Sequence, residues 1–217
     1  LPISEEHPQH PVDVNGIRYR WPGKPVVVVC IDGGDPAYLR QFLADGAIPN
    51  IARFMRQGFA TIADGTVPSF TCPNNMSIIT GTPASKHGIS GNYYLDTATG
   101  EAVVMTGPEL LRGDTILARF AAAGARVVSI TAKDKLRKQL GKNLDLTRGN
   151  VSFSSERAHQ CTLAENGIEN VLELVGMPLP DAPFAQGGFP THNGRAQVDA
   201  CGLGVPEFVP NHESVQS

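Results

Sequence analysis

Apolar runs alternate with amphipathic stretches along most of this chain. Residues 26–31 form a continuous, mostly β-branched apolar run, which predicts a strand buried on both faces. Residues 36–44 and 49–57 follow with apolar positions at helical spacing, and a second strand-like run spans 126–131. This alternation predicts an α/β fold with a mostly parallel sheet and helices on both faces.

Local start and stop signals place the helix ends. Asp35 precedes a proline and is the expected N-cap of the first helix, while Gly58 is expected to end the second. Asp114 is the expected cap of a helix over 115–123. Thr162 and Glu165 form a capping-box pattern, which predicts one helix that continues to residue 175.

Shorter segments complete the predicted order of elements. A short strand is expected over 59–63, followed by a loop and a helix over 73–80. Residues 93–104 read as two extended pieces around a polar turn, and residues 134–140 as a basic helix.

The pattern divides the chain into three parts. Residues 1–25 are expected to form an arm with a small hairpin at the turn dipeptide Asn15-Gly16. Residues 26–181 form the expected α/β domain. Residues 182–217 are rich in Gly, Pro, Asn and His and show no sustained period, so they are expected to be an irregular tail without metal ligands.

Composition excludes several classes of protein. The 217 residues carry a net charge of −3 and 18% charged residues, which argues against a dedicated nucleic-acid binder. No apolar run reaches the roughly 20 residues that a membrane span needs. Because the start of the sequence lacks a signal pattern and the four cysteines are widely spaced, we expect free thiols and a cytoplasmic location.

Two residues lie at positions that favour metal binding or anion binding. Asp32 directly follows the first apolar run, and a carboxylate at the tip of a strand is a common metal ligand. Thr71 precedes Cys72-Pro73 at a predicted helix start, where a hydroxyl meets backbone N–H groups that favour an anionic phosphoryl or sulfuryl group. The alternatives are that Thr71 only caps the helix and that Asp32 only serves a turn.

Four motifs occur in order: Asp32-Gly33, Pro49-Asn50, residues 67–71 and residues 80–92. Together they resemble the alkaline phosphatase superfamily, in particular its nucleotide pyrophosphatase/phosphodiesterase branch. Within that branch they are most similar to the phosphonoacetate hydrolases. The resemblance covers residues 24–180 and corresponds to the N-terminal half of such a protein, so the expected fold is alkaline-phosphatase-like but incomplete relative to the family.

The resemblance implies a zinc-dependent hydrolase that cleaves the C–P bond of phosphonoacetate to acetate and phosphate. Thr71 would be the nucleophile and, with Asp32, a zinc ligand. Asn92 would donate a hydrogen bond to a phosphoryl oxygen, and Lys133 and Lys135 would receive the substrate carboxylate. The alternatives are that Asn92 serves a turn and that the two lysines begin a solvated helix.

The family binds two zinc ions, and this chain supplies ligands for at most one. An Asp with a His four residues later, an Asp-His dipeptide and a late single His are all absent at the family's spacings. His87 is expected to pack structurally rather than bind zinc. The expected partner is a small phosphonate, without nucleic acid or membrane, and a homodimer is left open. Two alternative functions remain: a phosphodiesterase or pyrophosphatase of the same superfamily, and an inactive truncated chain that acts only as a binding module.

Overall fold

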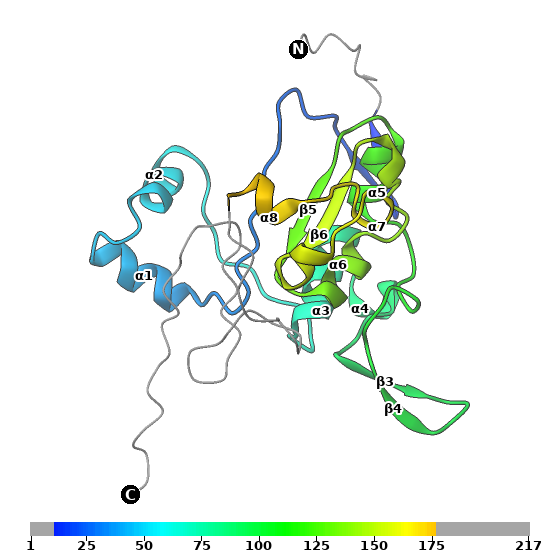
Figure 1. Cartoon of the computed structure of the whole chain (residues 1–217). Helices are drawn as coiled ribbons and strands as arrows, with labels where there is room; N and C mark the ends of the chain where they lie inside the picture. Colours follow the sequence, from blue (N-terminus) through cyan, green and yellow to red (C-terminus); the bar gives the residue numbers. More distant parts are fainter. Residues whose placement is uncertain (1–10, 177–217) are drawn as a thin grey trace, which may run out of the picture.

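The computed structural model describes residues 11–176 of the chain. The tail expected over 182–217 lies outside the described residues, as do the last residues of the expected α/β domain. The described part contains short helices and three separate two-stranded sheets (Figure 1).

The chain begins with the predicted hairpin, β1 (Val12–Val14) and β2 (Ile17–Tyr19), which pair antiparallel. Asn15 and Gly16 both have positive φ, as a two-residue hairpin turn requires. The Asn15 side chain donates to the carbonyl oxygens of Thr80 and Asp114, each at 2.8 Å. The turn therefore joins segments that are distant in sequence.

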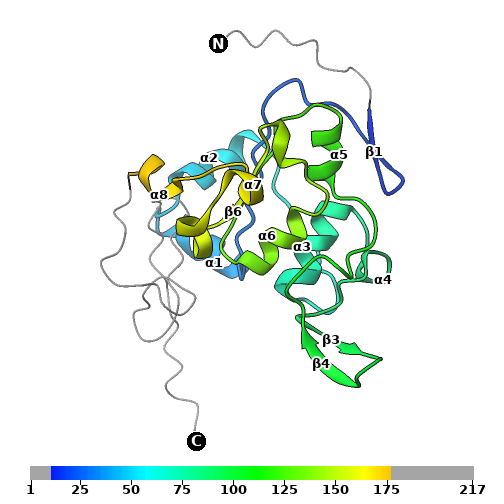
Figure 2. The ribbon, with the colours of Figure 1, turned by 45° about the vertical axis from the view of Figure 1, so that its right-hand side comes forward.

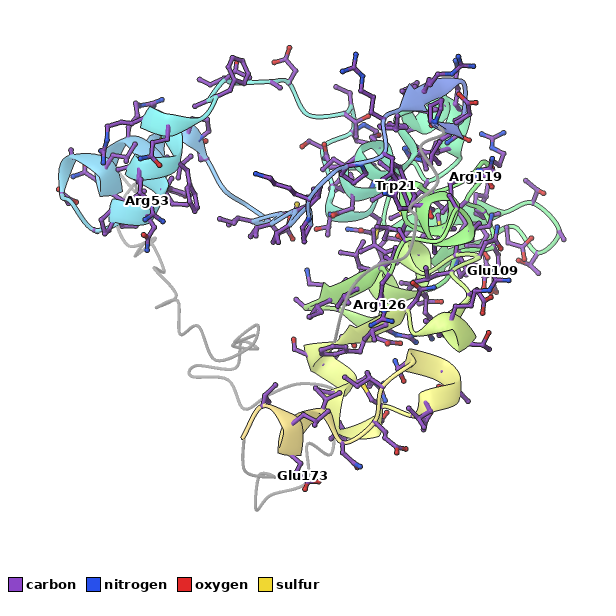
Figure 3. The ribbon with its side chains drawn as sticks, turned by 90° about the horizontal axis from the view of Figure 1, so that it is seen from above. Trp21, Arg53, Glu109, Arg119, Arg126 and Glu173 are labelled. Atoms are coloured by element: carbon purple, nitrogen blue, oxygen red, sulfur yellow. The ribbon has the colours of Figure 1, made fainter. Side chains whose placement is uncertain are left out.

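Helices α1 (Pro36–Ala44) and α2 (Pro49–Gln57) have the predicted ranges. Asp35 caps α1 as expected, since its Oδ1 accepts from the Ala37 N–H at 2.6 Å, and α2 ends at Gly58. Neither helix buries a residue, and both stand apart from the rest of the described chain, joined to it by two extended segments (Figure 3).

The strands predicted over 26–31 and 59–63 are wrong for this structure. Both segments lie outside every strand, and their apolar side chains are exposed: Val27 by 84% and Phe59 by 88%. The physical reason is that a buried strand needs a paired edge and a layer on each face. Within residues 11–176 nothing supplies them to these segments.

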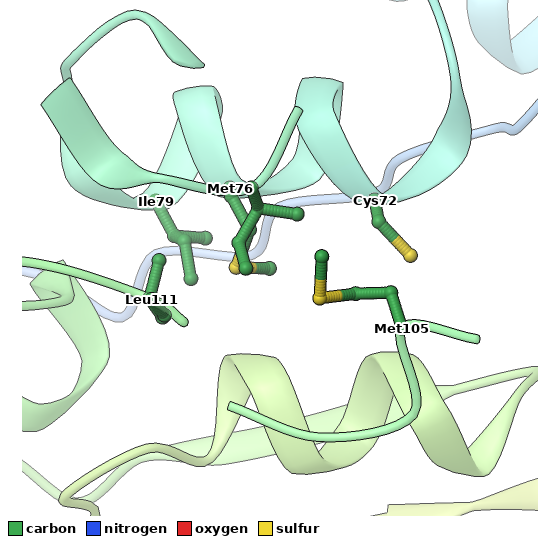
Figure 4. Packing of buried hydrophobic residues seen from close by; sticks show 6 residues of the cluster. Cys72, Met76, Ile79, Met105 and Leu111 are labelled. Carbon is green, nitrogen blue, oxygen red and sulfur yellow. The ribbon is translucent and has the colours of Figure 1, made fainter. Parts of the chain in front are cut away.

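The main core lies between α3 (Thr71–Thr80) and α6 (Asp134–Leu140), which are side by side in two views (Figure 1, Figure 2). Helix α3 begins two residues earlier than predicted. A short helix, α4 (Ala84–His87), follows it. The buried side chains of this core come from α3 and from the loops that cross it (Figure 4): Cys72, Met76, Ile79, Ile89, Met105 and Leu111.

The two extended pieces predicted over 93–104 are confirmed as the hairpin of β3 (Tyr93–Asp96) and β4 (Glu101–Val104), which projects from the molecule (Figure 1). The next helix, α5 (Ile116–Ala122), is capped by Thr115 rather than by Asp114. Thr115 Oγ1 accepts from the Ala118 N–H at 3.0 Å.

Strands β5 (Val128–Thr131) and β6 (Val151–Ser154) form the one parallel pair among the described residues. Helix α6, confirmed over its predicted range, packs on this pair. Ser129 and Thr131 are buried, whereas Val128 and Ile130 on the other face are exposed. The fold is therefore mixed α/β, but the expected mostly parallel sheet with helices on both faces is reduced here to two-stranded sheets.

The single helix predicted over 162–175 is broken in two. Thr162 caps α7 (Leu163–Asn166) through the Glu165 N–H, but Gly167 at φ +70° ends it. A Cβ on Gly167 would collide with the Asn150 carbonyl, so the chain turns where only glycine fits. The 3₁₀ turns η1 (Leu146–Arg148) and η2 (Ser155–Gln160) flank β6, and α8 (Val171–Leu174) covers Phe153. None of the helices in residues 11–176 combines the length and apolar character of a membrane span.

Candidate active site

Asp32 and Thr71, 39 residues apart in sequence, meet in space. Thr71 Oγ1 donates a hydrogen bond to Asp32 Oδ2 at 2.9 Å. Thr71 is the first residue of α3, and Asp32 directly follows the extended segment 26–31. Two ligands of one zinc ion must lie close together, and these two residues do, although Asp32 does not lie at the tip of a strand as expected. Their roles as nucleophile and zinc ligands stay predictions.

The start of α3 can bind an anion. The N–H groups of Thr71 and Cys72 have no acceptor inside the helix, and Pro73 has no N–H. In a ten-residue helix these groups carry the positive end of the dipole. An oxyanion beside the Thr71 hydroxyl would therefore be stabilised.

Two asparagines that the sequence reasoning missed hold this turn in place. Asn75 Nδ2 donates to the Thr71 carbonyl at 2.9 Å, and Asn74 Oδ1 accepts from the Thr66 N–H at 2.9 Å. The second bond fixes the loop that enters α3. Two asparagines in the first turn of a predicted helix were the available signal, because asparagine side chains bind nearby backbone groups.

Lys133 brings a positive charge to the same place. Its Nζ lies 3.9 Å from Asp32 Oδ2, and both side chains are more than half exposed. Lys133 precedes α6 and follows β5, so three separate elements deliver Asp32, Thr71 and Lys133 to one solvent-accessible cluster. We call these three residues the Thr71 cluster.

The first turn of α6 is held by Asp134. Burial would raise the pKa of Asp134, but the hydrogen bond and charge of Arg137, at 2.6 Å, together with Lys138 hold that pKa below its ordinary value. The Asp134 N–H also donates to Glu156 Oε2 at 2.8 Å. These contacts fix the position of Lys133, the preceding residue.

Lys135 acts on the same end of α3. Burial raises the pKa of Cys72, the neighbour of Thr71, and the positive charges of Lys135 and then Lys133 oppose that rise. Both lysines therefore lie close enough to Cys72 for their charges to act on it. Lys135 is half-buried, whereas Lys133 is exposed.

Asn92 lies at the base of the β3–β4 hairpin. Its carbonyl oxygen accepts from the Met105 N–H at 2.8 Å, while its side-chain Oδ1 is buried without a hydrogen-bond partner. Among residues 11–176 no hydrogen bond joins Asn92 to the Thr71 cluster. Its role as a phosphoryl ligand stays a prediction.

His87 is fully buried and packs structurally, as expected. Its Nδ1 accepts from the Ile89 N–H at 3.1 Å, so the neutral ring carries its proton on Nε2, which lies 3.0 Å from Ser77 Oγ. The ring therefore donates to Ser77 and cannot take its proton. Burial lowers the pKa of His87 and outweighs the backbone carbonyl groups of His87 and Pro73, which would raise that pKa; the nearby charge of Arg112 also lowers it.

The donors present do not complete a metal site. Zinc in proteins takes about four ligands, and the Thr71 cluster offers two oxygen donors, Asp32 Oδ2 and Thr71 Oγ1. Within residues 11–176 no three His, Cys, Asp or Glu side chains are grouped closely enough to share a metal ion. The described residues thus fit part of a zinc site and not the whole of one.

Comparison with solved structures identifies close relatives. The chain is 47% identical to phosphonoacetate hydrolase from Sinorhizobium meliloti 1021 in complex with phosphonoformate, with a TM-score of 0.76. The same protein in complex with phosphonoacetate matches at 46% identity and the same TM-score. Each match covers 80% of this chain and 42% of the solved chain. The match includes the fold of the alkaline phosphatase superfamily.

A curated relative and a family model agree with this. An uncharacterised pyrophosphatase/phosphodiesterase of Schizosaccharomyces pombe is 31% identical over 159 residues, which are 73% of this chain and 32% of that protein. The chain thus spans less than half the length of the relatives it matches. The model of the type I phosphodiesterase / nucleotide pyrophosphatase family matches residues 26–145, a range that contains every predicted site residue. The chain therefore belongs to the type I phosphodiesterase / nucleotide pyrophosphatase family and resembles phosphonoacetate hydrolase within it.

Proposed function

We propose that this chain carries the nucleophile-bearing part of a hydrolase that converts phosphonoacetate to acetate and phosphate. The observation that carries the proposal is the Thr71 cluster, which joins a hydroxyl, a carboxylate and an ammonium group at a helix start. The 47% identity to a phosphonoacetate hydrolase supports this choice of substrate.

Thr71 is the group that attacks phosphorus. Its hydrogen bond to Asp32 orients Oγ1. The free N–H groups at the start of α3 donate hydrogen bonds to the phosphonate oxygens. The Thr71 Oγ–P bond forms as the C–P bond breaks, and the carbon leaves with the electron pair. Protonation of that carbon gives acetate, and water then hydrolyses the phosphothreonine to phosphate and free Thr71.

Asp32 orients this hydroxyl but is too weak a base to ionise it alone. An alcohol is a far weaker acid than a carboxylic acid, so the hydrogen bond by itself leaves the proton on Thr71. Ionisation of Thr71 therefore needs a further group that the described residues do not supply.

Lys133 and Lys135 are suited to the carboxylate end of the substrate. Both charges lie beside the start of α3, and an ammonium group forms strong charge-assisted hydrogen bonds with a carboxylate. Negative charge spreads onto this carboxylate as the carbon departs, so the same contacts strengthen in the transition state.

A phosphodiesterase or pyrophosphatase is the second candidate, favoured by the family model and by the Schizosaccharomyces pombe relative. Such an enzyme would use Asp32 and Thr71 in the same way but would have no need of the lysine pair.

A substrate panel followed by ³¹P NMR tests the proposal. The full chain is incubated with zinc and with phosphonoacetate, a nitrophenyl phosphodiester or a dinucleotide, and both line shifts and new phosphate are recorded. We expect phosphonoacetate to bind in preference to the diesters and to release phosphate in any complete form of the site. Preference for the diesters would select the second candidate, and binding without turnover would indicate a binding module. If no compound binds, the proposal fails.

A further inference from the structure

A cleft at the C-terminal end of α6 lies apart from the Thr71 cluster. Its volume is about 460 Å³, and small-molecule sites span roughly 300–1,000 Å³. Lys133, the member of the Thr71 cluster nearest α6, precedes the first turn of that helix, whereas the cleft begins at its last turn. We call it the α6 cleft. Its polar lining includes Glu109, Arg137, Lys138, Lys142, Ser152 and Glu165.

The floor of the α6 cleft holds a buried hydroxyl group without a partner. Ser152 on β6 is 2% exposed, and its Oγ forms no hydrogen bond within the described part of the chain. A buried hydroxyl group that lacks a partner is unfavourable. A ligand atom that accepts from Ser152 Oγ would therefore gain a hydrogen bond without breaking one.

Gly141, which ends α6, leaves room beside this hydroxyl group. Its φ of −78° suits any residue, so the backbone does not require glycine there. A Cβ at this position would lie 3.2 Å from Ser152 Oγ and 3.0 Å from the Arg137 carbonyl oxygen. The glycine therefore keeps unfilled the space that a side chain would take from a ligand.

Three cationic side chains line the cleft, and Lys142 is the one best able to bind a ligand. Arg137 and Lys138 are already paired with Asp134, at 2.6 and 3.4 Å. Lys142 takes part in no ion pair among residues 11–176 and gives one of its three N–H groups to the Leu111 carbonyl oxygen. Its other N–H groups remain for an acidic group.

Two carboxylates line the same cleft from other elements. Glu109 lies in the loop after β4 and Glu165 on α7, and neither forms an ion pair with another described residue. A purely anionic ligand would be repelled by these carboxylates, and a purely cationic ligand would be repelled by Lys142. A ligand with both charges has a partner for each.

We infer that the α6 cleft binds a small zwitterion of the amino acid class. Its acidic group pairs with Lys142 and accepts a hydrogen bond from Ser152 Oγ, while its ammonium group pairs with Glu109 and Glu165. The long side chain of Lys142 moves with the ligand and admits the acidic group to the buried hydroxyl. The site uses no residue of the Thr71 cluster and no metal ion, so it stands whether or not the proposed function holds.

Titration calorimetry of the full chain with γ-aminobutyrate tests this site. Butyrate and butylammonium are the reference ligands, because each keeps one of the two charges. We expect γ-aminobutyrate to bind about 10- to 150-fold more tightly than either, the factor that corresponds to one lost charge-assisted hydrogen bond. Equal affinity for butyrate would indicate an anion site and equal affinity for butylammonium a cation site. Either result, or no binding of any ligand, would overturn the inference.

Charge-removing variants assign the two ends of the ligand. Lys142→Gln should weaken γ-aminobutyrate and butyrate and leave butylammonium unchanged, whereas Glu165→Gln should weaken γ-aminobutyrate and butylammonium and leave butyrate unchanged. Lys86→Gln and Glu101→Gln are matched controls at exposed residues outside the cleft and should change none of the three affinities. Equal losses for all three ligands in both cleft variants would contradict the assignment.

Two further variants test the floor of the cleft. Ser152→Ala removes a hydroxyl group that has no partner, so it should weaken γ-aminobutyrate about 10-fold or more without lowering the urea unfolding midpoint. Gly141→Ala places a methyl group beside Ser152 Oγ and should also weaken γ-aminobutyrate, while alanine preserves the end of α6. Normal binding of γ-aminobutyrate by both folded variants would show that no ligand reaches Ser152, and the inference would fail.

Discussion

At the scale of single residues, the contact between Thr71 Oγ1 and Asp32 Oδ2 ties the chemistry to the fold. It forms because helix α3 begins at Thr71, beside the end of the extended segment 26–31 that leads to Asp32. The surrounding asparagines and lysines are placed by the same two helices, α3 and α6. A substitution of one of these side chains should therefore change that side chain's own role in the proposed reaction and leave the roles of the other side chains unchanged.

Thr71→Ala should abolish turnover in any complete form of this protein, while Thr71→Ser should retain part of it. Serine keeps the hydroxyl nucleophile and alanine has none. Phosphate release followed by ³¹P NMR makes the comparison. Appreciable turnover by the alanine variant would remove Thr71 from the mechanism.

Lys133→Ala and Lys135→Ala should weaken binding of phosphonoacetate more than binding of phenyl phosphate, which has no carboxylate. The loss of a charge-assisted hydrogen bond costs about 1.5–3 kcal/mol, equivalent to a factor of roughly 10 to 150 in affinity. Titration calorimetry with both ligands measures the difference. Lys86→Ala, at an exposed lysine on α4, serves as the control. Equal losses for the two ligands would assign the lysines to structure.

His87 should make the fold sensitive to acid. The unfolded chain takes up a proton near the ordinary pKa of 6.5, whereas burial lowers the pKa of folded His87. The unfolded state therefore binds more protons as the pH falls below 6.5, and the stability present above that value is progressively lost. Protonation would also break the bond from the Ile89 N–H.

Urea unfolding at pH 7.5 and 5.5 measures this effect. The natural chain should lose more stability between these pH values than His87→Gln, which cannot titrate. Parallel losses in the two proteins would place the acid sensitivity elsewhere.

At the scale of elements, a single side chain caps the start of helices α1, α5 and α7. Thr115 and Asp114 are adjacent candidates for the cap of α5, and only Thr115 Oγ1 accepts the Ala118 N–H. The backbone of Asp114 instead forms two hydrogen bonds with the side chain of Asn15. The residue expected to cap the helix is therefore bound to the turn of the β1–β2 hairpin.

Thr115→Ala should therefore destabilise the fold by about 1 kcal/mol, the usual cost of a lost N-cap. Asp114→Ala removes an exposed carboxylate 3.9 Å from Arg119 and should cost less than about 0.5 kcal/mol. Chemical denaturation of both variants gives the comparison. A larger loss for Asp114→Ala would reverse this assignment of the cap.

At the scale of the whole molecule, one part of the described chain is well packed and another part is exposed. The core of α3, α6 and the β5–β6 pair is packed, whereas segment 26–31 and helices α1 and α2 bury nothing. The site lies at the border between the two parts, because Thr71 and Lys133 belong to the packed part and Asp32 to the open one.

Hydrogen exchange should report this difference. The amides of residues 26–31 should exchange much faster than those of 128–131, since only the latter belong to a parallel ladder. Mass spectrometry of peptic peptides resolves the two segments. Equal protection of both would mean that segment 26–31 is covered in solution.

Local signals in the sequence were sufficient for most helices. Asp35 and Thr162 cap the helices that follow them, and Asn15-Gly16 forms the predicted hairpin, because each feature depends on neighbours a few residues away. The helix expected over 162–175 is interrupted at Gly167. The backbone of Gly167 lies so close to Asn150, a residue 17 positions earlier, that only glycine fits there. That contact has no local signal.

The sequence by itself determined the family, the approach of Asp32 to Thr71 and the candidate chemistry, because ordered motifs record positions that chemistry requires. Only the tertiary structure decided which cap α5 uses, that His87 donates to Ser77, and that segment 26–31 is uncovered. An apolar run indicates that a strand is suited to burial. Burial itself requires a neighbouring strand that pairs with it and layers that cover its faces. Among the described residues those partners are absent, so the same six residues that predict the centre of a sheet form an exposed surface.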